Sequence, residues 1–424
     1  MKPQLPACIY LKMSGVKRIL VFCLLVAIGG SGLVHCNGTS PRSVDNVANV
    51  VPDDNFADGT IIPGAERTEL YLPLCKDKNV AIVANNSSLI RGEHLVDVLA
   101  SNNVNIVKIF SPEHGFRGDA GAGQHVDNQI DTKTGIEVVS LYGKNRKPSD
   151  EDLLDVDVLI FDLQDVGVRF YTYISTLTYV MESCAENDIQ LVVLDRPNPN
   201  AAYVDGPVLK SGYESFVGMH HVPIVYGMTI GEYGRMVNGE HWYRGNKKCD
   251  LVIIPIANYN HSSDYTLPVN PSPNLRSKKA ITMYPTICLF EGTVLSVGRG
   301  TTIPFEIIGH PDLKDADTVF VPQDMPSAAV NPKHEGKKCK AFLLDDVYNE
   351  IRQTKTLNID ILTRAYNNLN IGEKFFTSYF DKLAGTNELR KQIMAGKTAG
   401  QIRQSWHDDI EAFKTIRAKY LIYD

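Results

Sequence analysis

Most of the chain alternates between short apolar runs and longer stretches in which apolar residues recur every three or four positions. The short runs have the length of buried strands, and the longer stretches have the period of amphipathic helices. The expected strands cover residues 80–84, 104–110, 137–141, 156–161, 189–194 and 251–256, and the expected helices cover residues 93–101, 150–154 and 174–187. This alternation predicts an α/β fold with a Rossmann-like, mainly parallel sheet and helices on both faces.

The second half of the chain has a different pattern. Five prolines between residues 268 and 304 separate short segments, and a helix-rich tail begins near Asp345. An apolar stripe at helical spacing predicts that the tail packs against the body; it consists of Ile402, Trp406, Ile410, Phe413 and Ile416. Because 424 residues exceed one compact core, we expect two subdomains. They are a Rossmann-like subdomain over residues 64–263 and a smaller α/β subdomain with a helical C-terminal tail over residues 264–424, after a flexible tether over residues 37–63.

The first 36 residues carry four basic residues and no acidic residue, and their apolar stretch from Ile19 to Ile28 is too short to span a bilayer. This pattern predicts a signal peptide over residues 1–36, with translation starting at Met1 or at Met13. The mature protein is therefore expected to be exported, either to the periplasm or to the envelope. The segment ends at Cys36, which is a lipid anchor if the last four residues form a lipobox and is removed with the segment if they form a plain signal-peptidase site.

Charge and cysteine content narrow the expected partners. Without the signal segment the chain keeps its 49 acidic residues and 39 of its 43 basic ones, a net charge of −10. Such a body is not expected to bind nucleic acid or an anionic membrane. Five cysteines without CxxC spacing indicate neither a disulfide framework nor a zinc site; they are Cys75, Cys184, Cys249, Cys288 and Cys339. We expect no cofactor and no membrane span.

Polar residues follow three of the expected strands. The strand over 104–110 runs into Glu113, His114 and Arg117. The strands over 156–161 and 189–194 are followed by Asp162, Gln164, Asp165, Arg169, Tyr171 and Tyr173, and by Asp195 and Arg196, respectively. Parallel sheets bind their ligands outside the carboxyl ends of their strands, so these residues are expected to meet at one rim.

Carboxylates at this rim suit acid–base chemistry. A desolvated Glu113 would have a raised pKa, as a general acid requires, although the same residue could cap a turn or pair with Arg117. His114 could orient Glu113, contact a substrate or only fill the rim. Glycoside hydrolysis uses two carboxylates, for which Asp162, Asp165 and Asp195 are candidates, and the spacing does not select one.

A second group of residues suits sugar recognition. Arg169 offers a forked donor for an anionic group, and the rings of Tyr171 and Tyr173 could stack on a pyranose; the alternative is a helix start packed by a surface arginine. Further along the chain, Glu291 and Arg299 lie in a glycine-rich polar stretch. Gly298 and Gly300, the glycines beside Arg299, suggest a close backbone approach to a ligand.

Two other chemistries fit the pattern less well. The glycine-dense loop over 118–123 lacks the third glycine of GxGxxG, which disfavours a dinucleotide site. Four histidines and Asp162 could ligate zinc, but the chain has no HExxH spacing; the histidines are His114, His125, His220 and His221.

Eight motifs appear in order along the chain. They are SPEHGFRG from Ser111, FDLQDVGVRFYTY from Phe161, LDRPNP from Leu194, DGP from Asp205, GMT from Gly227, PSPN from Pro271, LFEGT from Leu289 and GRGTTIPF from Gly298. In these motifs the chain resembles the NamZ-type exo-β-N-acetylmuramidases of bacterial cell-wall recycling, from Gly64 to Asp424. The resemblance implies a Rossmann-like body, a second subdomain with the active site between them, and release of N-acetylmuramic acid from the non-reducing end of peptidoglycan fragments. It places the family's proposed catalytic glutamate at Glu113.

The resemblance also implies roles for other motif residues. Matching positions are His114, Arg117, Asp162, Gln164, Arg169, Asp195, Glu291 and Arg299. Arg169 or Arg299 facing the lactyl carboxylate would explain a preference for muramic acid over glucosamine. The chain departs from the family pattern at Tyr226, where histidine is common, and at Val269, where tryptophan is common. A non-catalytic muropeptide-binding protein and a metal-dependent hydrolase remain the alternatives, and the stereochemical outcome stays open.

Overall fold

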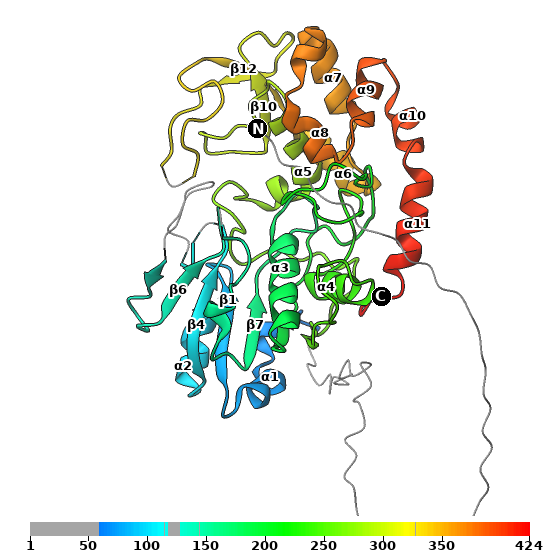
Figure 1. Ribbon diagram of the computed structural model, residues 1–424. Helices are drawn as coiled ribbons and strands as arrows, with labels where there is room; N and C mark the ends of the chain where they lie inside the picture. Colours follow the sequence, from blue (N-terminus) through cyan, green and yellow to red (C-terminus); the bar gives the residue numbers. More distant parts are fainter. Residues whose placement is uncertain (1–58, 114, 118–127, 144, 327) are drawn as a thin grey trace, which may run out of the picture. The chain divides into compact units, whose positions relative to one another are not determined.

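The computed structural model describes residues 59–113, 115–117, 128–143, 145–326 and 328–424 (Figure 1). All of them belong to one compact unit of the chain. The expected signal peptide, most of the expected tether, His114, His125 and the glycine-dense loop lie outside these residues. Within the described part of the chain, no helix is long and apolar enough to cross a membrane. The folded body begins just before the expected boundary, because buried Ile62 pairs with Ala257.

A seven-stranded sheet forms the first half of the body. Its order is β5 (Gln129–Ile130), β6 (Glu137–Ser140), β4 (Asn105–Ser111), β1 (Asn79–Ala84), β7 (Val158–Asp162), β8 (Gln190–Leu194) and β9 (Leu251–Ile254). All neighbours pair in parallel except β5 with β6. The six parallel strands follow the doubly wound order 3-2-1-4-5-6, so the chain reverses direction across the sheet between β1 and β7.

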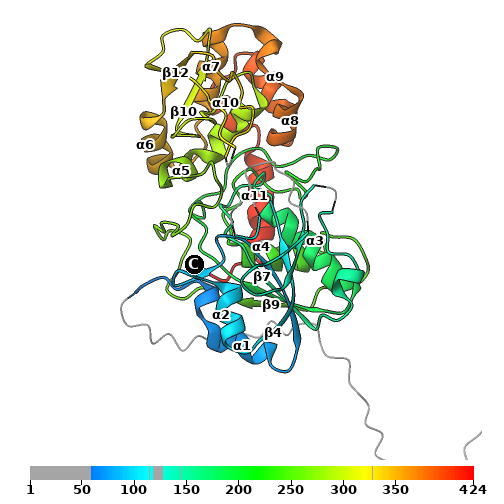
Figure 2. The same ribbon diagram turned by 90° about the vertical axis from the view of Figure 1, so that its left-hand side faces the viewer.

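Helices cover both faces of this sheet, as the alternation predicted (Figure 2). Helices α1 (Thr68–Cys75) and α2 (Leu95–Ser101) bury one face, and α3 (Tyr173–Glu186) and α4 (Ile230–Gly239) bury the other. Strand β1 contributes to both, because Val80 and Ile82 pack in the α1–α2 core whereas Ala81 and Val83 pack in the α3–α4 core. The expected strands differ from those observed by at most two residues at each end.

Two expected helices are shorter than predicted. The pattern over 93–101 begins as a short antiparallel ribbon of β2 (Leu89–Ile90) and β3 (Glu93–His94), and α2 starts only at Leu95. The expected helix over 150–154 is a single 3₁₀ turn, Glu151–Leu153. Both segments have only a few apolar residues at helical spacing, which do not determine where a helix begins and ends.

The second half contains strands and a helical C-terminal part, as expected, and its strands form a small antiparallel sheet. The sheet has the order β10 (Ile307–His310), β12 (Cys339–Leu343) and β11 (Thr318–Phe320). Helix α5 (Lys278–Ile287) precedes it, and the tail contains α6 (Asp345–Thr354), α7 (Asp360–Leu369), α8 (Ser378–Ala384), α9 (Glu388–Met394), α10 (Ala399–Gln404) and α11 (His407–Arg417).

The apolar stripe of the tail packs on the body, which confirms that expectation. Ile402, Trp406, Ile410 and Phe413 are buried, and Ile416 is partly buried against the same core. The stripe crosses the break between α10 and α11. At the break, Trp406 Nε1 donates a hydrogen bond of 3.1 Å to Asp205, which fixes the tail to a distant loop.

Candidate active site

The carboxyl ends of β1 and β7 meet at a rim of interlocked polar groups. In the turn after β1, Asn85 Oδ1 accepts hydrogen bonds from the Ser87 amide at 2.9 Å and hydroxyl at 2.6 Å. Ser87 Oγ in turn accepts one from the Gln164 amide at 3.2 Å, and Ser88 Oγ donates to the Asp162 carbonyl at 2.5 Å. The point where the strand order reverses is therefore rigid, and ligands of doubly wound sheets bind at such a point.

Glu113 lies after β4, the other neighbour of β1 in the sheet, and lines a cavity of about 360 Å³. Glu291, Arg299 and Lys333 line the same cavity. Tyr142 shares a hydrogen bond with Glu113, and burial together with this negative neighbour raises the pKa of Tyr142 to about 12. The fold thus brings together three of the residues predicted from the sequence, Glu113, Glu291 and Arg299.

Glu291 and Arg299 form a two-pronged ion pair. Arg299 Nε lies 2.5 Å from Glu291 Oε1, and a second nitrogen donates to Oε2 at 3.2 Å. Burial disfavours the charged form of the Arg299 guanidinium, but the negative charge of the Glu291 carboxylate outweighs this effect and raises the pKa of Arg299. Gly300 has φ +78°, and a Cβ there would lie 2.4 Å from the carbonyl oxygen of Gln323. The close backbone approach suggested by the sequence exists, but it is an approach to the chain's own backbone.

Lys333 is a functional candidate that the sequence did not single out. Its ammonium donates hydrogen bonds to the backbone carbonyls of Thr293 and Glu291. No carboxylate of the described residues lies within ion-pair distance of it. Lys333 is exposed as a whole residue, but desolvation of its ammonium by the surrounding protein lowers the pKa of Lys333 to about 8. No motif contains this lysine, so only the fold identifies it.

Asp162, one of the three candidates for the second carboxylate, is fully buried and paired with Arg196. Arg196 Nε lies 2.5 Å from Asp162 Oδ1, Nη2 lies 2.8 Å from Oδ2, and Nη2 also donates to the Leu89 carbonyl at 3.1 Å. The pair joins the ends of β7 and β8 and raises the pKa of Arg196. Glu291 lines the Glu113 cavity and Asp162 does not, so the fold brings Glu291 to the same cavity as Glu113.

Arg169 is also fully buried, and its guanidinium contacts backbone carbonyls of the protein. One terminal nitrogen donates to the carbonyls of Pro207 and Val222 at 2.7 Å, and the other donates to those of Leu383 and Ala384 at 3.0 and 2.7 Å. Burial lowers its pKa, but the guanidinium stays charged at neutral pH. Four carbonyls occupy its two terminal nitrogens, so Arg169 ties the loop after β7 to helix α8.

Gln164 and Asp165 lie behind the rim. Gln164 donates to the carbonyls of Asp165 and Pro197 at 2.8 Å. Asp165 accepts from the Gly167 amide at 2.7 Å and from the hydroxyl of Tyr226, the residue that departs from the family pattern. Burial raises the pKa of Asp165 to about 6. These contacts hold the loop after β7 in place.

The two tyrosines are buried and pack edge to face, with ring centroids 4.9 Å apart. Tyr171 donates to the Pro271 carbonyl at 2.6 Å, and the Tyr173 hydroxyl accepts from Asn85 at 2.7 Å. Burial is the largest cause that raises the pKa of Tyr173, and the negative charge of Glu113 raises it further. The rings support the site from behind; they offer no open face for stacking on a sugar.

Asp195 and Arg117 also form hydrogen bonds that connect different parts of the fold. Asp195 accepts from Thr229 Oγ1 and from the Tyr423 hydroxyl, both at 2.7 Å, so it anchors the C-terminus. Arg117 bonds to Asp131 at 2.8 and 2.9 Å and to a second carboxylate, Asp97, at 3.1 and 3.2 Å.

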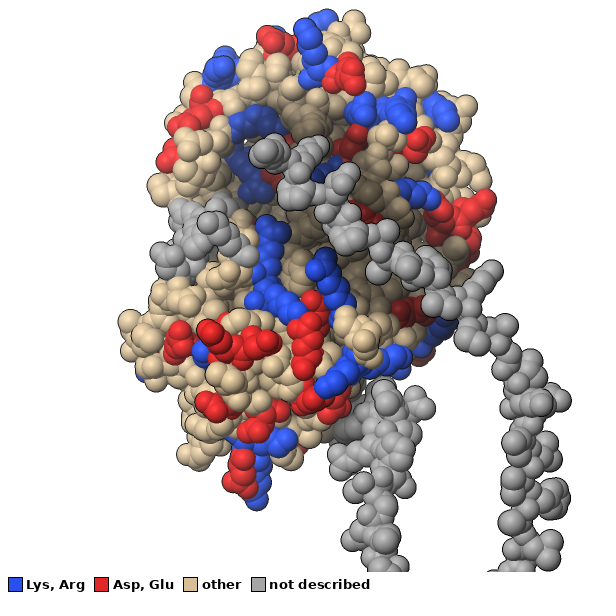
Figure 3. Space-filling model, in the orientation of Figure 1, with Lys and Arg blue, Asp and Glu red and all other residues tan. Residues whose placement is uncertain are grey.

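On the face of the molecule seen in Figure 3, Lys and Arg side chains gather beside a hollow.

The described cysteines and histidines show no metal-site geometry. All five cysteines of the body are buried and free. His220 bonds to the Tyr233 hydroxyl and the Trp242 carbonyl, and His221 bonds to the Leu209 carbonyl. Within the described ranges, no three or more Cys, His, Asp or Glu side chains gather as a ligand set would.

Comparison with known proteins identifies the family. Residues 80–279 match the profile of the NamZ exo-β-N-acetylmuramidase N-terminal domain, and residues 282–423 match that of the C-terminal domain. The peptidoglycan β-N-acetylmuramidase NamZ of Bacillus subtilis (strain 168) is 36% identical over 434 residues, covering 96% of this chain and all of that protein. Two crystal structures of DUF1343 family proteins from Bacteroides fragilis NCTC 9343 share the fold. One has a TM-score of 0.80 at 46% identity and the other 0.72 at 29%, and each match covers 86% of this chain and 99% of the other. The chain therefore belongs to the NamZ family of exo-β-N-acetylmuramidases, which are glycoside hydrolases.

Proposed function

We propose that the protein releases β-1,4-linked N-acetylmuramic acid from the non-reducing end of peptidoglycan fragments, with Glu113 as the general acid. The observation that carries this proposal is the shared cavity, which holds Glu113, a second carboxylate and two cations in about 360 Å³. A protonated Glu113 donates its proton to the glycosidic oxygen as the bond to the leaving sugar breaks. Family membership supports the bond type, and the cavity supports the residue.

Glu291 is our candidate for the second carboxylate. The two hydrogen bonds from Arg299 fix the orientation of the Glu291 carboxylate. A carboxylate in this place attacks the anomeric carbon, activates water or stabilises positive charge on the sugar. Arg299 is committed to Glu291 and acts through it. Arg299 is therefore a positioning residue in this proposal, which revises its expected contact with the lactyl carboxylate.

We assign the contact with the lactyl carboxylate to Lys333. The four arginines predicted at the site are each engaged, Arg117, Arg196 and Arg299 by carboxylates and Arg169 by carbonyls. Lys333 lines the cavity without a carboxylate partner among the described residues. Its pKa is lowered because the desolvation of its ammonium outweighs the attraction of the negative charge of Glu291. A lactyl carboxylate would supply the missing charge, whereas N-acetylglucosamine would not.

We further propose that the protein is exported and that its mature form begins after the signal segment. Export would place the enzyme in the compartment that holds its substrate. The pattern of residues 1–36 supports this proposal, with Cys36 either lipidated or removed with the segment. Mass spectrometry of the N-terminus from a producing cell tests it, because a chain that starts at Met1 or Met13 would contradict export.

The central experiment incubates residues 37–424 with the MurNAc-GlcNAc disaccharide and with para-nitrophenyl MurNAc, with and without EDTA. We expect release of free N-acetylmuramic acid that EDTA does not change. Glu113→Gln should lower kcat by about 10²- to 10⁴-fold, the usual contribution of general acid catalysis. Glu151→Gln, at an exposed glutamate, is the matched control. Binding without release would favour the muropeptide-binding alternative, and loss of release with EDTA would favour the metal-dependent one.

A further inference from the structure

Tyr379 is an exposed tyrosine of helix α8 that lies close to the Glu113 cavity. Its exposed fraction is 38%, whereas the next residue, Phe380, is fully buried. A Cβ on Gly292 would lie 2.4 Å from the Cα of Phe380, so the backbone of α8 lies directly against the residue that follows Glu291. The Tyr379 side chain therefore starts from a point beside one of the carboxylates of the site.

Hydrogen bonds fix the start of α8 to the same turn. The Gly292 carbonyl accepts from the Thr377 amide at 2.8 Å and from Thr377 Oγ1 at 3.1 Å. Thr377 Oγ1 also accepts from the Tyr379 amide at 3.3 Å. The backbone of Tyr379 is thus held in place before any ligand binds, and a ligand contact made by its side chain would need little further ordering of the chain.

The side chain of Tyr379 is available for a ligand. Its hydroxyl forms no hydrogen bond with a described residue, and no aromatic ring or cation of the described residues stacks on its ring. Tyr379 is exposed as a whole residue, but desolvation of its hydroxyl by the surrounding protein is the largest cause that raises its pKa, and Cys288, Glu291 and Glu113 raise it further. Charges shift a pKa from nearby positions, so the hydroxyl lies near both carboxylates.

Tyr379 does not itself line the Glu113 cavity. In an exo-acting enzyme the cavity takes the terminal sugar, and the general acid protonates the oxygen that joins this sugar to the next one. The next sugar therefore lies beside Glu113 and outside the cavity. Tyr379 matches this place, because its hydroxyl is near Glu113 and its exposed ring is outside the cavity lining.

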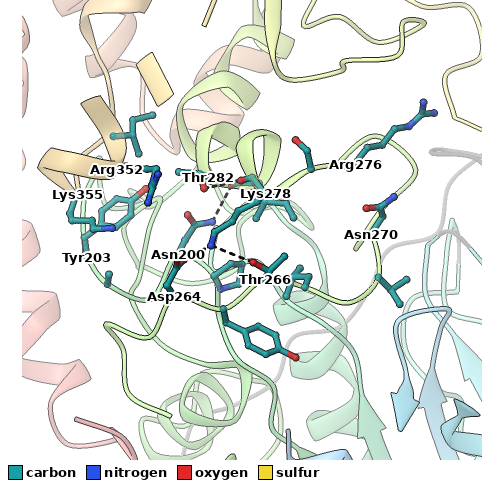
Figure 4. A pocket seen from close by; sticks show the side chains of 18 residues that line it. Asn200, Tyr203, Asp264, Thr266, Asn270, Arg276, Lys278, Thr282, Arg352 and Lys355 are labelled. Carbon is teal, nitrogen blue, oxygen red and sulfur yellow. Dashed lines mark hydrogen bonds and ion pairs between the residues drawn. The ribbon is translucent and has the colours of Figure 1, made fainter. Parts of the chain in front are cut away.

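The departure from the family pattern at Val269 lies in another place. Val269 lines a separate cavity of about 180 Å³ beside α5 and α6, whose lining also includes Asn270 and Arg352 (Figure 4). Among the described residues, this cavity and the Glu113 cavity share no lining residue. The change at Val269 therefore leaves the lining of the Glu113 cavity unaltered, and a contact between Tyr379 and a sugar does not depend on it.

We propose that Tyr379 binds the leaving sugar, the N-acetylglucosamine bonded to muramic acid, by stacking its ring on the sugar and donating a hydrogen bond to a sugar oxygen. The inference rests on the function proposed above. An aromatic ring covers the apolar face of a pyranose, and the hydroxyl supplies a polar end. Tyr379 would therefore favour substrates whose leaving group is a sugar over substrates whose leaving group is small.

The test compares MurNAc-GlcNAc with β-N-acetylmuramyl fluoride, which has the same terminal sugar but releases fluoride in place of a sugar. We expect Tyr379→Leu to lose about 10-fold in kcat/KM on the disaccharide, the combined effect of one ring contact and one neutral hydrogen bond, and to change little on the fluoride. Tyr379→Phe keeps the ring and should lose less than Tyr379→Leu. Tyr348→Leu, at a partly exposed tyrosine of α6 outside the cavity lining, is the matched control. An equal loss on both substrates, or no loss on the disaccharide, would overturn the proposal.

Calorimetry separates this inference from the proposed function, because it needs no turnover. The Glu113→Gln variant, with and without Tyr379→Leu, is titrated with MurNAc-GlcNAc and with MurNAc alone. We expect the added change to weaken binding of the disaccharide about 10-fold and to leave binding of the monosaccharide unchanged. A wild type that hydrolyses neither substrate, together with this difference in binding, would contradict the proposed function and support the Tyr379 contact. Equal binding of the disaccharide by both variants would refute the contact, whether or not the wild type is active.

Discussion

Replacing Lys333 with methionine tests how the enzyme distinguishes muramic acid from glucosamine. Methionine keeps most of the alkyl stem and removes the charge. A hydrogen bond between charged groups contributes about 1.5–3 kcal/mol, which corresponds to about 10- to 100-fold in kcat/KM. The variant also loses the hydrogen bonds to the carbonyls of Thr293 and Glu291, but that loss affects both substrates equally. The preference for muramic acid, a ratio of two rates, therefore isolates the contact with the lactyl carboxylate.

The assay measures kcat/KM for para-nitrophenyl MurNAc and para-nitrophenyl GlcNAc between pH 6 and pH 9. Because the pKa of Lys333 is lowered to about 8, its positive charge is present below that pH and is lost as the pH rises through it. In the wild type we expect kcat/KM on the muramic acid substrate to fall through pH 8. Lys333→Met should remove this decline together with the preference, and Lys333→Arg should retain the preference.

Two results would refute the reasoning about Lys333. The first is an unchanged preference for muramic acid in Lys333→Met. The second is a decline through pH 8 that persists in that variant, since another group would then be titrating. Lys337→Met, at an exposed lysine four residues away that does not line the cavity, controls for the general effect of losing a surface charge.

Three further predictions concern buried residues whose contacts affect the stability of the fold. Arg169→Met leaves four buried carbonyls without a donor, so urea unfolding should show a loss of at least about 4 kcal/mol; an unchanged Tm with a raised KM would instead mean that Arg169 binds substrate. Burial raises the pKa of Asp165 to about 6 and that of Asp195 to about 7, so the folded chain holds protons that the unfolded chain has released. Unfolding free energy should thus fall as the pH rises from about 4 to 7, by up to about 1.4 kcal/mol per pH unit and group, and Asp195→Asn should flatten that slope. Trp406→Phe removes the hydrogen bond to Asp205, so the Tm should fall, which calorimetry would detect.

The fold was largely predictable because its signals are local. A buried parallel strand requires a run of apolar residues on both faces, and β1 shows such a run from Val80 to Ala84. The polar residues after β4, β7 and β8 follow from the same periodicity. The strand order is not local, since it depends on which crossover packs on which face, and only the structure established it.

The site was predictable only in part, because a side chain's role depends on partners distant in sequence. The donors of Arg169 reach carbonyls 38, 53, 214 and 215 positions away. Nothing near Arg169 in the sequence distinguishes those partners from a substrate carboxylate. Lys333 shows the opposite case, since no motif marks it and it joins the cavity only because its loop folds back toward Thr293.

The family motifs therefore mix two kinds of residue, and physical chemistry explains why a motif cannot separate them. A buried pair such as Asp162 and Arg196 tolerates little change, because removing one partner leaves an uncompensated buried charge that costs about 3–5 kcal/mol. A catalytic carboxylate, the role that we propose for Glu113, tolerates little change because the reaction fails without it. Both requirements fix a residue type at one position of a sequence. They differ in what the side chain meets in the fold: Asp162 meets a guanidinium in the protein interior, whereas Glu113 meets a cavity with room for a sugar.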